Sequence, residues 1–128
     1  MDARLTGFSI SQLSENDLRI ASDKIIIRCS VLTGCEMPFT EFYAAALTEQ
    51  ILEIFVKFGF DKLTLAEILL AMEMNWMKYV QLPSGDYADE IRFEGKTVNV
   101  SFITKVLYKY MMIRNFLDRK LENHIDGY

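Results

Sequence analysis

The residue types that carry most enzyme and metal chemistry are sparse in this chain of 128 residues. It contains one histidine, His124, and two cysteines, Cys29 and Cys35, which lie six positions apart. A structural zinc site takes four ligands, usually cysteine or histidine, so these three residues cannot complete one. The sequence also has no Gly-rich phosphate loop. We therefore expect a protein that is not an enzyme and that holds no cofactor or metal.

Four carboxylates gather in one predicted loop, at Asp86, Asp89, Glu90 and Glu94. Oxygen ligands of this kind can bind Mg²⁺ or Ca²⁺, which makes a metal-dependent enzyme an alternative hypothesis. Their order does not match an EF-hand loop, however, and no nucleophile or general base accompanies them. Solvation of an exposed loop explains these residues better.

Basic residues gather on one side of the last predicted helix, which runs from about residue 101 to residue 123. At about 100° per residue they project opposite the apolar face, with two apolar side chains between them. The six residues of this predicted contact surface are Lys105, Lys109, Met112, Phe116, Arg119 and Lys120. Such a surface can bind a protein partner, or it can neutralise phosphates while an apolar side chain contacts a base.

The net charge of −4 hides a separation of charge along the chain. Residues 36–95 carry eleven acids and four bases, whereas residues 96–128 carry six bases and three acids. These two regions therefore have charges of −7 and +3. Because screening limits each field to about 10 Å at 0.1 M salt, they can offer different surfaces to partners.

Helix-capping residues predict the elements that position these side chains. Ser14 is a suitable N-cap for a helix that Gly34 ends, and Thr40 for a second helix that Gly59 ends. The β-branched residues within residues 24–31 are also compatible with a strand. We favour a helix there because both ends carry helix signals.

The clearest local signal is the sequence LTLAEI, in which Thr64 and Glu67 have the spacing of a capping box. Leu63 and Ile68 have the spacing of a hydrophobic staple across the same helix start. We predict a third helix from here to about residue 79. Its short link to the second helix makes the two helices neighbours.

The region between the third and fourth helices loses the helical period. Residues 91–100 alternate around Glu94-Gly95-Lys96, which predicts a small β-hairpin. A two-stranded hairpin is marginal alone, so its apolar residues should pack against the helices: Ile91, Phe93, Val98 and Val100.

Apolar residues at helical spacing predict the core. The first helix contributes Leu18, Ala21, Ile25, Cys29 and Leu32; the second Tyr43, Leu47, Gln50, Ile51, Ile54, Phe55 and Phe58; the last Ile103, Val106, Leu107, Tyr110, Ile113, Leu117 and Leu121. Cys29 is thus expected to be a buried, inert thiol. Arg114 projects on the apolar side and needs a carboxylate or carbonyl partner if it is buried.

Composition agrees with a folded domain, at 51% hydrophobic and 25% charged residues and a mean hydropathy of +0.10. We predict a mainly α fold, in which residues 1–128 form a single four-helix domain with the small β-hairpin between the third and fourth helices. Residues 1–13 are expected to form a flexible or loosely packed N-terminal arm. No apolar run is long enough for a bilayer and the start does not resemble a secretion signal, so we expect a cytoplasmic protein with reduced thiols and no membrane partner.

Two stretches carry a family resemblance: LTLAEILLAMEMN, and NVSFITKVLYKYMMIRNFLDRKL. A capped LTLAEI helix, a Gly-containing hairpin, and a helix with Tyr110 and Arg114 together resemble small uncharacterised proteins of phages and mobile elements in Bacteroidota-type bacteria. The resemblance covers roughly residues 40–128. It implies an accessory role near DNA replication or element maintenance, such as an adaptor or loader for a replication protein, and it carries over no catalytic residues.

These observations lead to one main functional prediction and two alternatives. The main prediction is a non-enzymatic binding or adaptor protein with a protein partner, linked to the DNA replication or maintenance of a phage or mobile element. The alternatives are direct binding of single-stranded DNA by the basic helix and the metal-dependent enzyme using the loop at residues 86–94. A second copy of the chain is left open as a partner.

Overall fold

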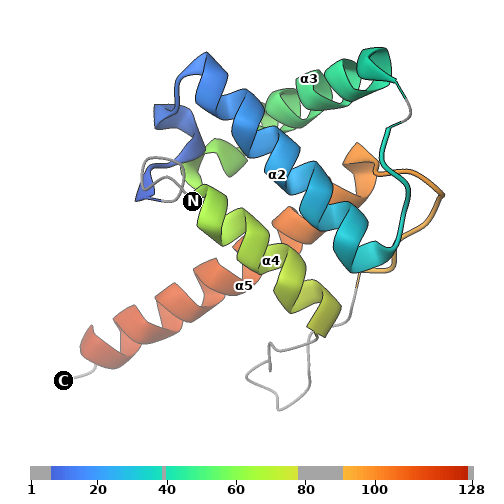
Figure 1. The fold of residues 1–128 in the computed structure, drawn as a ribbon. Helices are drawn as coiled ribbons and strands as arrows, with labels where there is room; N and C mark the ends of the chain where they lie inside the picture. The colour runs from blue at the N-terminus through green and yellow to red at the C-terminus, as the bar shows by residue number, and fades with distance from the viewer. Residues whose placement is uncertain (1–6, 39, 78–90, 127–128) are drawn as a thin grey trace.

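The computed structural model describes residues 7–38, 40–77 and 91–126, with side chains described to Asn75 in the third long helix and to Asn115 in the last. The mainly helical architecture is confirmed, and residues 24–31 are helical (Figure 1). In chain order the elements are η1 (Ile10–Gln12), α2 (Glu15–Thr33), α3 (Glu41–Phe58), η2 (Phe60–Lys62), α4 (Leu65–Met77) and α5 (Val100–Asp126).

The helix ends follow the predicted capping residues. The hydroxyls of Ser14 and Thr40 each accept a hydrogen bond at 3.2 Å from the backbone N–H three residues later. Gly34 and Gly59 end α2 and α3 with φ of 73° and 75°, a left-handed conformation that favours glycine. Local chemistry therefore sets the lengths of α2 and α3.

The core draws on all four long helices. In Figure 1, α2 lies beside α4, and α5 crosses the other side of α4. The predicted apolar rows of α2 and of the first half of α5 are confirmed, since their central residues are almost completely buried: Ala21, Ile25, Cys29, Ile103, Val106 and Leu107.

The predicted apolar row of α3 is wrong at its two ends. Leu47, Ile51 and Phe55 are buried, but the side chain of Tyr43 is 64% exposed and that of Phe58 is 43% exposed. Gln50 is also exposed. The elements packed on α3 thus cover a narrower row than the sequence period predicts.

The predicted β-hairpin is not supported by the described residues. The 91–100 segment pairs instead with residue 36: the N–H of Glu36 donates to the Lys96 carbonyl at 2.7 Å, and the N–H of Val98 donates to the Glu36 carbonyl at 3.1 Å. This single parallel bridge joins Glu36 to Thr97. An isolated hairpin gains little in water, and pairing with the chain after α2 keeps the segment against the helices.

The packing expected of this segment is nevertheless observed. Val98 is buried, and Ile91, Phe93 and Val100 are partly buried against the core. The rings of Phe93 and Phe102 meet edge to face with centroids 5.2 Å apart. The apolar residues thus pack as predicted although the strands do not pair.

Asn99, which the hairpin prediction placed in a strand, caps α5 instead. Its Oδ1 accepts a hydrogen bond from the N–H of Phe102 at 2.9 Å, as expected of an N-cap residue. Its Nδ2 donates to the Glu94 carbonyl at 3.2 Å, beside Gly95, whose φ is 111°. One asparagine side chain therefore fixes both the turn and the start of α5.

The segment before α2 is attached to the body of the protein from residue 9 onward. The N–H of Ile10 donates to the Leu63 carbonyl at 2.8 Å, and Ser9 forms an antiparallel bridge with Thr64. Ile10 and Leu13 belong to the buried core. This part of the 1–13 segment therefore packs against the start of α4.

Within the described residues, no helix combines the length and the apolar character that a membrane span requires.

α5 is the longest helix, with 27 residues, which corresponds to a length of about 40 Å. Its first two turns enter the core. Its C-terminal part extends away from the other helices (Figure 1). A single rod is therefore anchored at one end and projects at the other.

Candidate functional site

The predicted contact surface on α5 is described in part. Lys105 is exposed and the side chain of Met112 is 60% exposed. Lys109 turns toward α4, where its Nζ donates to Oδ1 of Asn75 at 3.4 Å. The side chains of the other three predicted residues lie outside the described ones: Phe116, Arg119 and Lys120. Lys105 and Met112 thus lie on the solvent-exposed side of α5, whereas Lys109 forms a hydrogen bond with α4.

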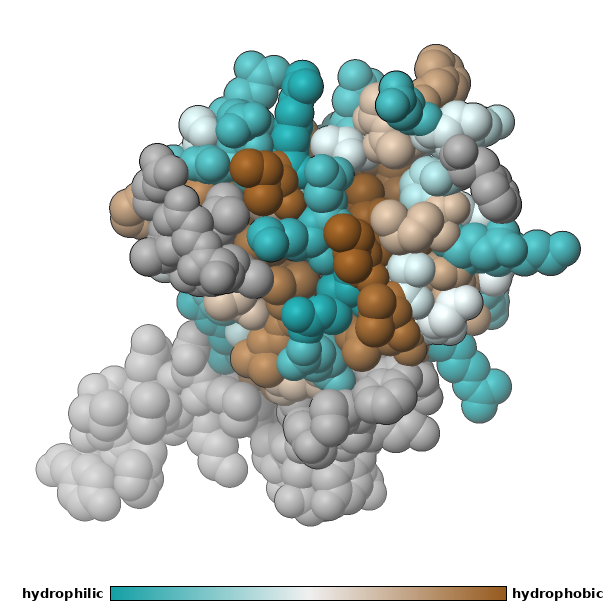
Figure 2. All heavy atoms as spheres, viewed as in Figure 1, coloured by the Kyte–Doolittle hydropathy of each residue, from teal (hydrophilic) through white to brown (hydrophobic). Residues whose placement is uncertain are grey.

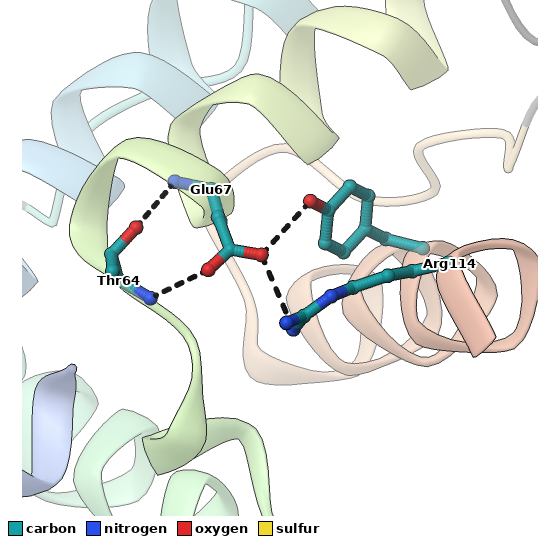
Figure 3. A network of polar contacts seen from close by, with 4 residues as sticks. Thr64, Glu67 and Arg114 are labelled. Atoms are coloured by element: carbon teal, nitrogen blue, oxygen red, sulfur yellow. Dashed lines mark hydrogen bonds and ion pairs between the residues drawn. The ribbon is translucent and has the colours of Figure 1, made fainter. Parts of the chain in front are cut away.

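The start of α4 carries the capping box that the sequence predicts. The N–H of Glu67 donates to the Thr64 hydroxyl at 3.1 Å, and the N–H of Thr64 donates to Oε1 of Glu67 at 3.4 Å (Figure 3). Leu63 and Ile68, the two residues of the predicted staple, are completely buried. This confirmed cap also orients the Glu67 carboxylate toward α5.

The second carboxylate oxygen of Glu67 binds α5. Oε2 accepts a hydrogen bond from the Tyr110 hydroxyl at 3.1 Å and lies 3.2 Å from a guanidinium nitrogen of Arg114 (Figure 3). Arg114 thus has a carboxylate partner, one of the two kinds of partner predicted for it if buried. The Arg114 and Glu67 side chains are 43% and 27% exposed, so the ion pair itself contributes little to stability. With both oxygens engaged, the Glu67 carboxylate connects the start of α4 to α5.

Asn75 forms a second polar connection, between α4 and the extended segment. Its Nδ2 donates to the Ile91 carbonyl at 3.1 Å, and its Oδ1 accepts from the Ile91 N–H at 2.8 Å. Asn75 is only 6% exposed. The Asn75 side-chain amide therefore makes the two backbone hydrogen bonds that a neighbouring strand would have made with Ile91 in a hairpin.

Both cysteines are buried at the end of α2, as the sequence predicts for Cys29. The hydroxyl of Thr33 donates to the Cys29 carbonyl at 2.6 Å, and Cys35 Sγ lies 2.9 Å from the same hydroxyl oxygen. Burial, with a smaller effect of neighbouring Cys35, raises the pKa of Cys29 from 9.0 to about 12. A neutral buried thiol is a poor nucleophile.

We expect Cys29 to resist alkylation in the folded protein. At pH 8 iodoacetamide should modify it more slowly than in the urea-unfolded chain by a factor of roughly one hundred or more, because the reagent needs an accessible thiolate. Mass spectrometry of digests quenched at successive times measures both rates. Equal rates in the two states would contradict the prediction.

The same raised pKa predicts a dependence of stability on pH. Because the folded pKa lies above the unfolded one, the contribution of the neutral thiol is complete below pH 9 and is lost as the pH rises toward 12. Urea unfolding of wild type and Cys29→Ala at pH 8 and pH 11 isolates this contribution, since the other groups that titrate are shared.

Among the described residues, no group of three or more histidine, cysteine, aspartate or glutamate side chains is placed to hold a metal ion. Glu94 is exposed, and Asp86, Asp89 and Glu90 lie outside the described residues. The predicted acidic loop at residues 86–94 is therefore described only at its end.

An apolar groove of about 550 Å³ opens between the first half of α3 and residues 97–100. We call it the α3 groove. Phe42 and Tyr43 are 78% and 64% exposed, and their rings meet edge to face with centroids 5.9 Å apart. The residues that line the groove are Pro38, Phe42, Tyr43, Ala46, Leu47, Gln50, Thr97, Val98, Asn99 and Val100.

The α3 groove was not predicted from the sequence, because the predicted apolar row of α3 places Tyr43 in the core. A signal was nevertheless present. Phe42 and Tyr43 are adjacent and therefore point about 100° apart on a helix, so one narrow buried row cannot cover both. An aromatic pair in the first turn of a helix thus indicates a surface beside the core row.

Two glutamates lie close to the α3 groove. Glu53 follows Gln50 by three residues, which makes it a neighbour on the helix surface. Glu36 lies on the segment that pairs with residues 96–98. Both glutamates are exposed, as is Lys96, a basic residue of the same segment. The groove is thus apolar inside, with two acidic residues and one basic residue beside it.

A second apolar area covers α2. Figure 2 shows hydrophobic side chains that reach the surface along this helix. Ile20, Ile27 and Val31 are 37%, 51% and 72% exposed and lie on one helix face. Beside them Arg28 pairs with Glu73 of α4. This row is a convex ridge, whereas the α3 groove is hollow and lined by two exposed aromatic rings.

Comparison of the chain with family models, with curated proteins and with solved structures found no match in any of the three. The surface features that could bind a partner are the α3 groove and the outer side of α5.

Proposed function

We propose that this protein is a non-enzymatic binding module that holds a polypeptide segment of a partner in the α3 groove. The observation that carries the proposal is the pair of exposed aromatic side chains, Phe42 and Tyr43, at a groove of about 550 Å³. Large aromatic residues dominate the binding energy of protein interfaces, and exposed apolar surface of this kind marks interaction sites.

The openness of the aromatic pair favours a polypeptide over a small molecule. Small-molecule sites bury roughly 70–90% of their ligand within a concave pocket. Here Phe42 and Tyr43 remain mostly exposed, so a compact ligand in the groove would leave much of both rings in water. A longer segment with side chains in the groove and backbone across its mouth would cover them.

The charges at the rim define the chemistry of that segment. Glu36 and Glu53 favour a partner with lysine or arginine beside its apolar anchors, since complementary charge speeds association and rejects acidic competitors. The proposed partner is thus a protein segment that is apolar at its centre and basic at its flanks.

The other functional hypotheses stay predictions. Contact with single-stranded DNA would use Lys105, Lys109, Arg119 and Lys120, of which Lys105 is exposed and Lys109 is engaged with Asn75. The link to replication or maintenance of a mobile element depends on the sequence resemblance. The groove requires neither of them.

Selection from a library of displayed random peptides tests the proposed function. We expect wild type to select sequences with apolar anchors flanked by lysine or arginine, and we expect the double variant Phe42→Ser, Tyr43→Ser to lose them. Val56→Ser is the matched control, because Val56 is 74% exposed on α3 and does not line the groove. Peptides that bind the double variant as well as wild type would contradict the proposal.

A labelled oligothymidine at low salt tests the DNA hypothesis on the same proteins. Binding that falls steeply with salt and is lost in Lys105→Glu would support single-strand contact. No binding at low salt would exclude it.

A further inference from the structure

A turn brings the two cysteines of the chain together at the end of α2. On one continuous helix, residues six positions apart would point about 120° apart. Here Gly34 adopts a φ of 73° and its N–H donates to the Ser30 carbonyl at 2.9 Å, so the chain reverses directly after α2. Cys35 therefore packs back against the end of the helix, where many helices make an apolar contact.

The two thiols are direct neighbours. The Cys29 and Cys35 side chains form a hydrogen bond with each other, and Cys35 Sγ lies 4.0 Å from the Cys29 carbonyl oxygen. Their side chains are 1% and 8% exposed. A disulfide has an S–S length of about 2 Å, so side-chain rotation is the movement that would join the two sulfur atoms.

Thr33 places a hydroxyl beside the pair. Its Oγ1 donates to the Cys29 carbonyl at 2.6 Å and lies 2.9 Å from Cys35 Sγ, and the Cys35 N–H donates to it at 3.3 Å. A hydroxyl has one proton, which can turn from the carbonyl to the sulfur. When Cys35 loses its own proton, Thr33 can therefore stabilise the thiolate by a charge-assisted hydrogen bond.

A cavity of about 160 Å³ beside the pair gives a small oxidant room. Cys29 and Thr33 both line it. A cavity of about 150 Å³ can hold a benzene molecule, so hydrogen peroxide, which is much smaller, fits next to the thiols. The pair is thus buried from large reagents while a small molecule has space beside it.

We infer that Cys29 and Cys35 form a redox site that hydrogen peroxide oxidises to an intramolecular disulfide. The Cys35 thiolate attacks one peroxide oxygen: an S–O bond forms, the O–O bond breaks, and the departing hydroxide takes the proton that Cys35 has lost. The Cys29 sulfur then attacks the Cys35 sulfenic acid: the S–S bond forms, the S–O bond breaks, and the second hydroxide leaves as water with the Cys29 proton. Two thiols thus give two electrons and two protons to the peroxide, which becomes two waters.

The order of the two steps follows from the difference between the thiols. The pKa of Cys29, raised to about 12 by burial, leaves roughly one thiol in ten thousand deprotonated at pH 8, so the more exposed Cys35 reacts first. The second step is intramolecular, and the effective concentration of an oriented neighbour can reach about 10⁵ M, which offsets that small fraction. Cys29 therefore reacts with Cys35 although it resists external reagents.

The disulfide fixes the segment that follows α2. Glu36 comes directly after Cys35, and its backbone pairs with the Lys96 carbonyl and the Val98 N–H. A covalent link from Cys35 to α2 limits local opening of this segment. In a reducing compartment the pair rests as thiols, and the disulfide is the transient state that an oxidant produces. This inference goes beyond the proposed function and does not depend on it.

Oxidation of the reduced full-length protein by hydrogen peroxide at pH 8 tests the inference. After catalase removes the peroxide, N-ethylmaleimide in urea counts the remaining thiols by mass. We expect two adducts before oxidation, none after it, and two again after dithiothreitol, with the protein monomeric throughout. Cys29→Ala should stop at the Cys35 sulfenic acid, which dimedone traps, whereas Cys35→Ala should give no dimedone adduct.

Hydrogen exchange measures the structural consequence. The amides of Glu36 and Val98 should exchange at least about tenfold more slowly in the oxidised protein, because their hydrogen bonds lie beside the new link. Peroxide-treated Cys35→Ala is the matched control, since its methionines meet the same oxidant. Circular dichroism verifies that each variant keeps the helical content of wild type.

Five outcomes would overturn the inference: two thiols that survive peroxide, a Cys35 sulfinic acid beside an unchanged Cys29, disulfide-linked dimers, a dimedone adduct in Cys35→Ala, and exchange at Glu36 and Val98 that oxidation leaves unchanged. An oxidation rate that rises steeply in urea below the unfolding transition would place the reaction in unfolded molecules and would also overturn it. A rate independent of such urea supports reaction in the folded protein.

Discussion

Asn75→Ala is expected to lower the free energy of unfolding by about 2–4 kcal/mol. The substitution removes both hydrogen bonds to the backbone of Ile91 and leaves its N–H and carbonyl without the amide that now pairs with them. A buried polar group that loses its partner costs about 1–3 kcal/mol. It also frees the start of the segment that leads to the α3 groove.

Urea unfolding followed by circular dichroism measures this loss, with Asn115→Ala as the matched control. Asn115 is an exposed asparagine on α5, and alanine there should change stability by less than about 0.7 kcal/mol, toward higher stability, because alanine is the better helix former. If Asn75→Ala cost no more than Asn115→Ala, the connection between α4 and residue 91 would not stabilise the fold.

Leu107→Ala should cost about 3 kcal/mol, within the 2–5 kcal/mol range for buried leucines. Leu107 is completely buried in the first half of α5. Removing its side chain loses the transfer free energy of the methyl groups and leaves a cavity among closely packed neighbours.

The matched control for this substitution is Leu70→Ala in α4. Leu70 is 47% exposed, so the same chemical change should cost less than about 1 kcal/mol. Denaturant midpoints of both variants decide the comparison. Equal losses would mean that α5 is not packed into the core at Leu107.

The features that could be predicted from the sequence depend on neighbouring residues. Ser14, Thr40 and the Thr64–Glu67 pair cap their helices as expected, because an N-cap needs only a hydroxyl or carboxylate three positions from the N–H that it accepts. The helical period of the apolar residues likewise locates the buried rows of α2 and of the first half of α5. N-caps depend on residues three positions apart, so the tertiary structure does not alter them.

The features that the sequence missed depend on residues far apart in the chain. Alternation in residues 91–100 indicates an extended segment but does not specify its neighbour, and Glu36 and Asn75 both lie outside it. Likewise, the period of α3 shows that Tyr43 shares a face with core residues. The period does not show that the elements packed on this face cover Leu47, Ile51 and Phe55 but leave Tyr43 exposed.

The candidate contact surface illustrates the same limit. Lys105 and Met112 are on the outside of α5, as the helical period predicts, but Lys109 reaches α4 because Asn75 offers an acceptor there. For Arg114 the sequence predicts a carboxylate or carbonyl partner if the residue is buried. Arg114 is exposed, and the partner that it has is the Glu67 carboxylate.

α5 spans two environments as one unbroken rod, with its first turns in the core and its last turns projecting away. A molecule that binds the distal turns only when they are folded therefore raises the free energy of unfolding of the entire domain. If a second molecule does so, the melting temperature becomes a property of the sample as well as of the chain: it rises with protein concentration, and dilution alone makes the same sequence easier to melt.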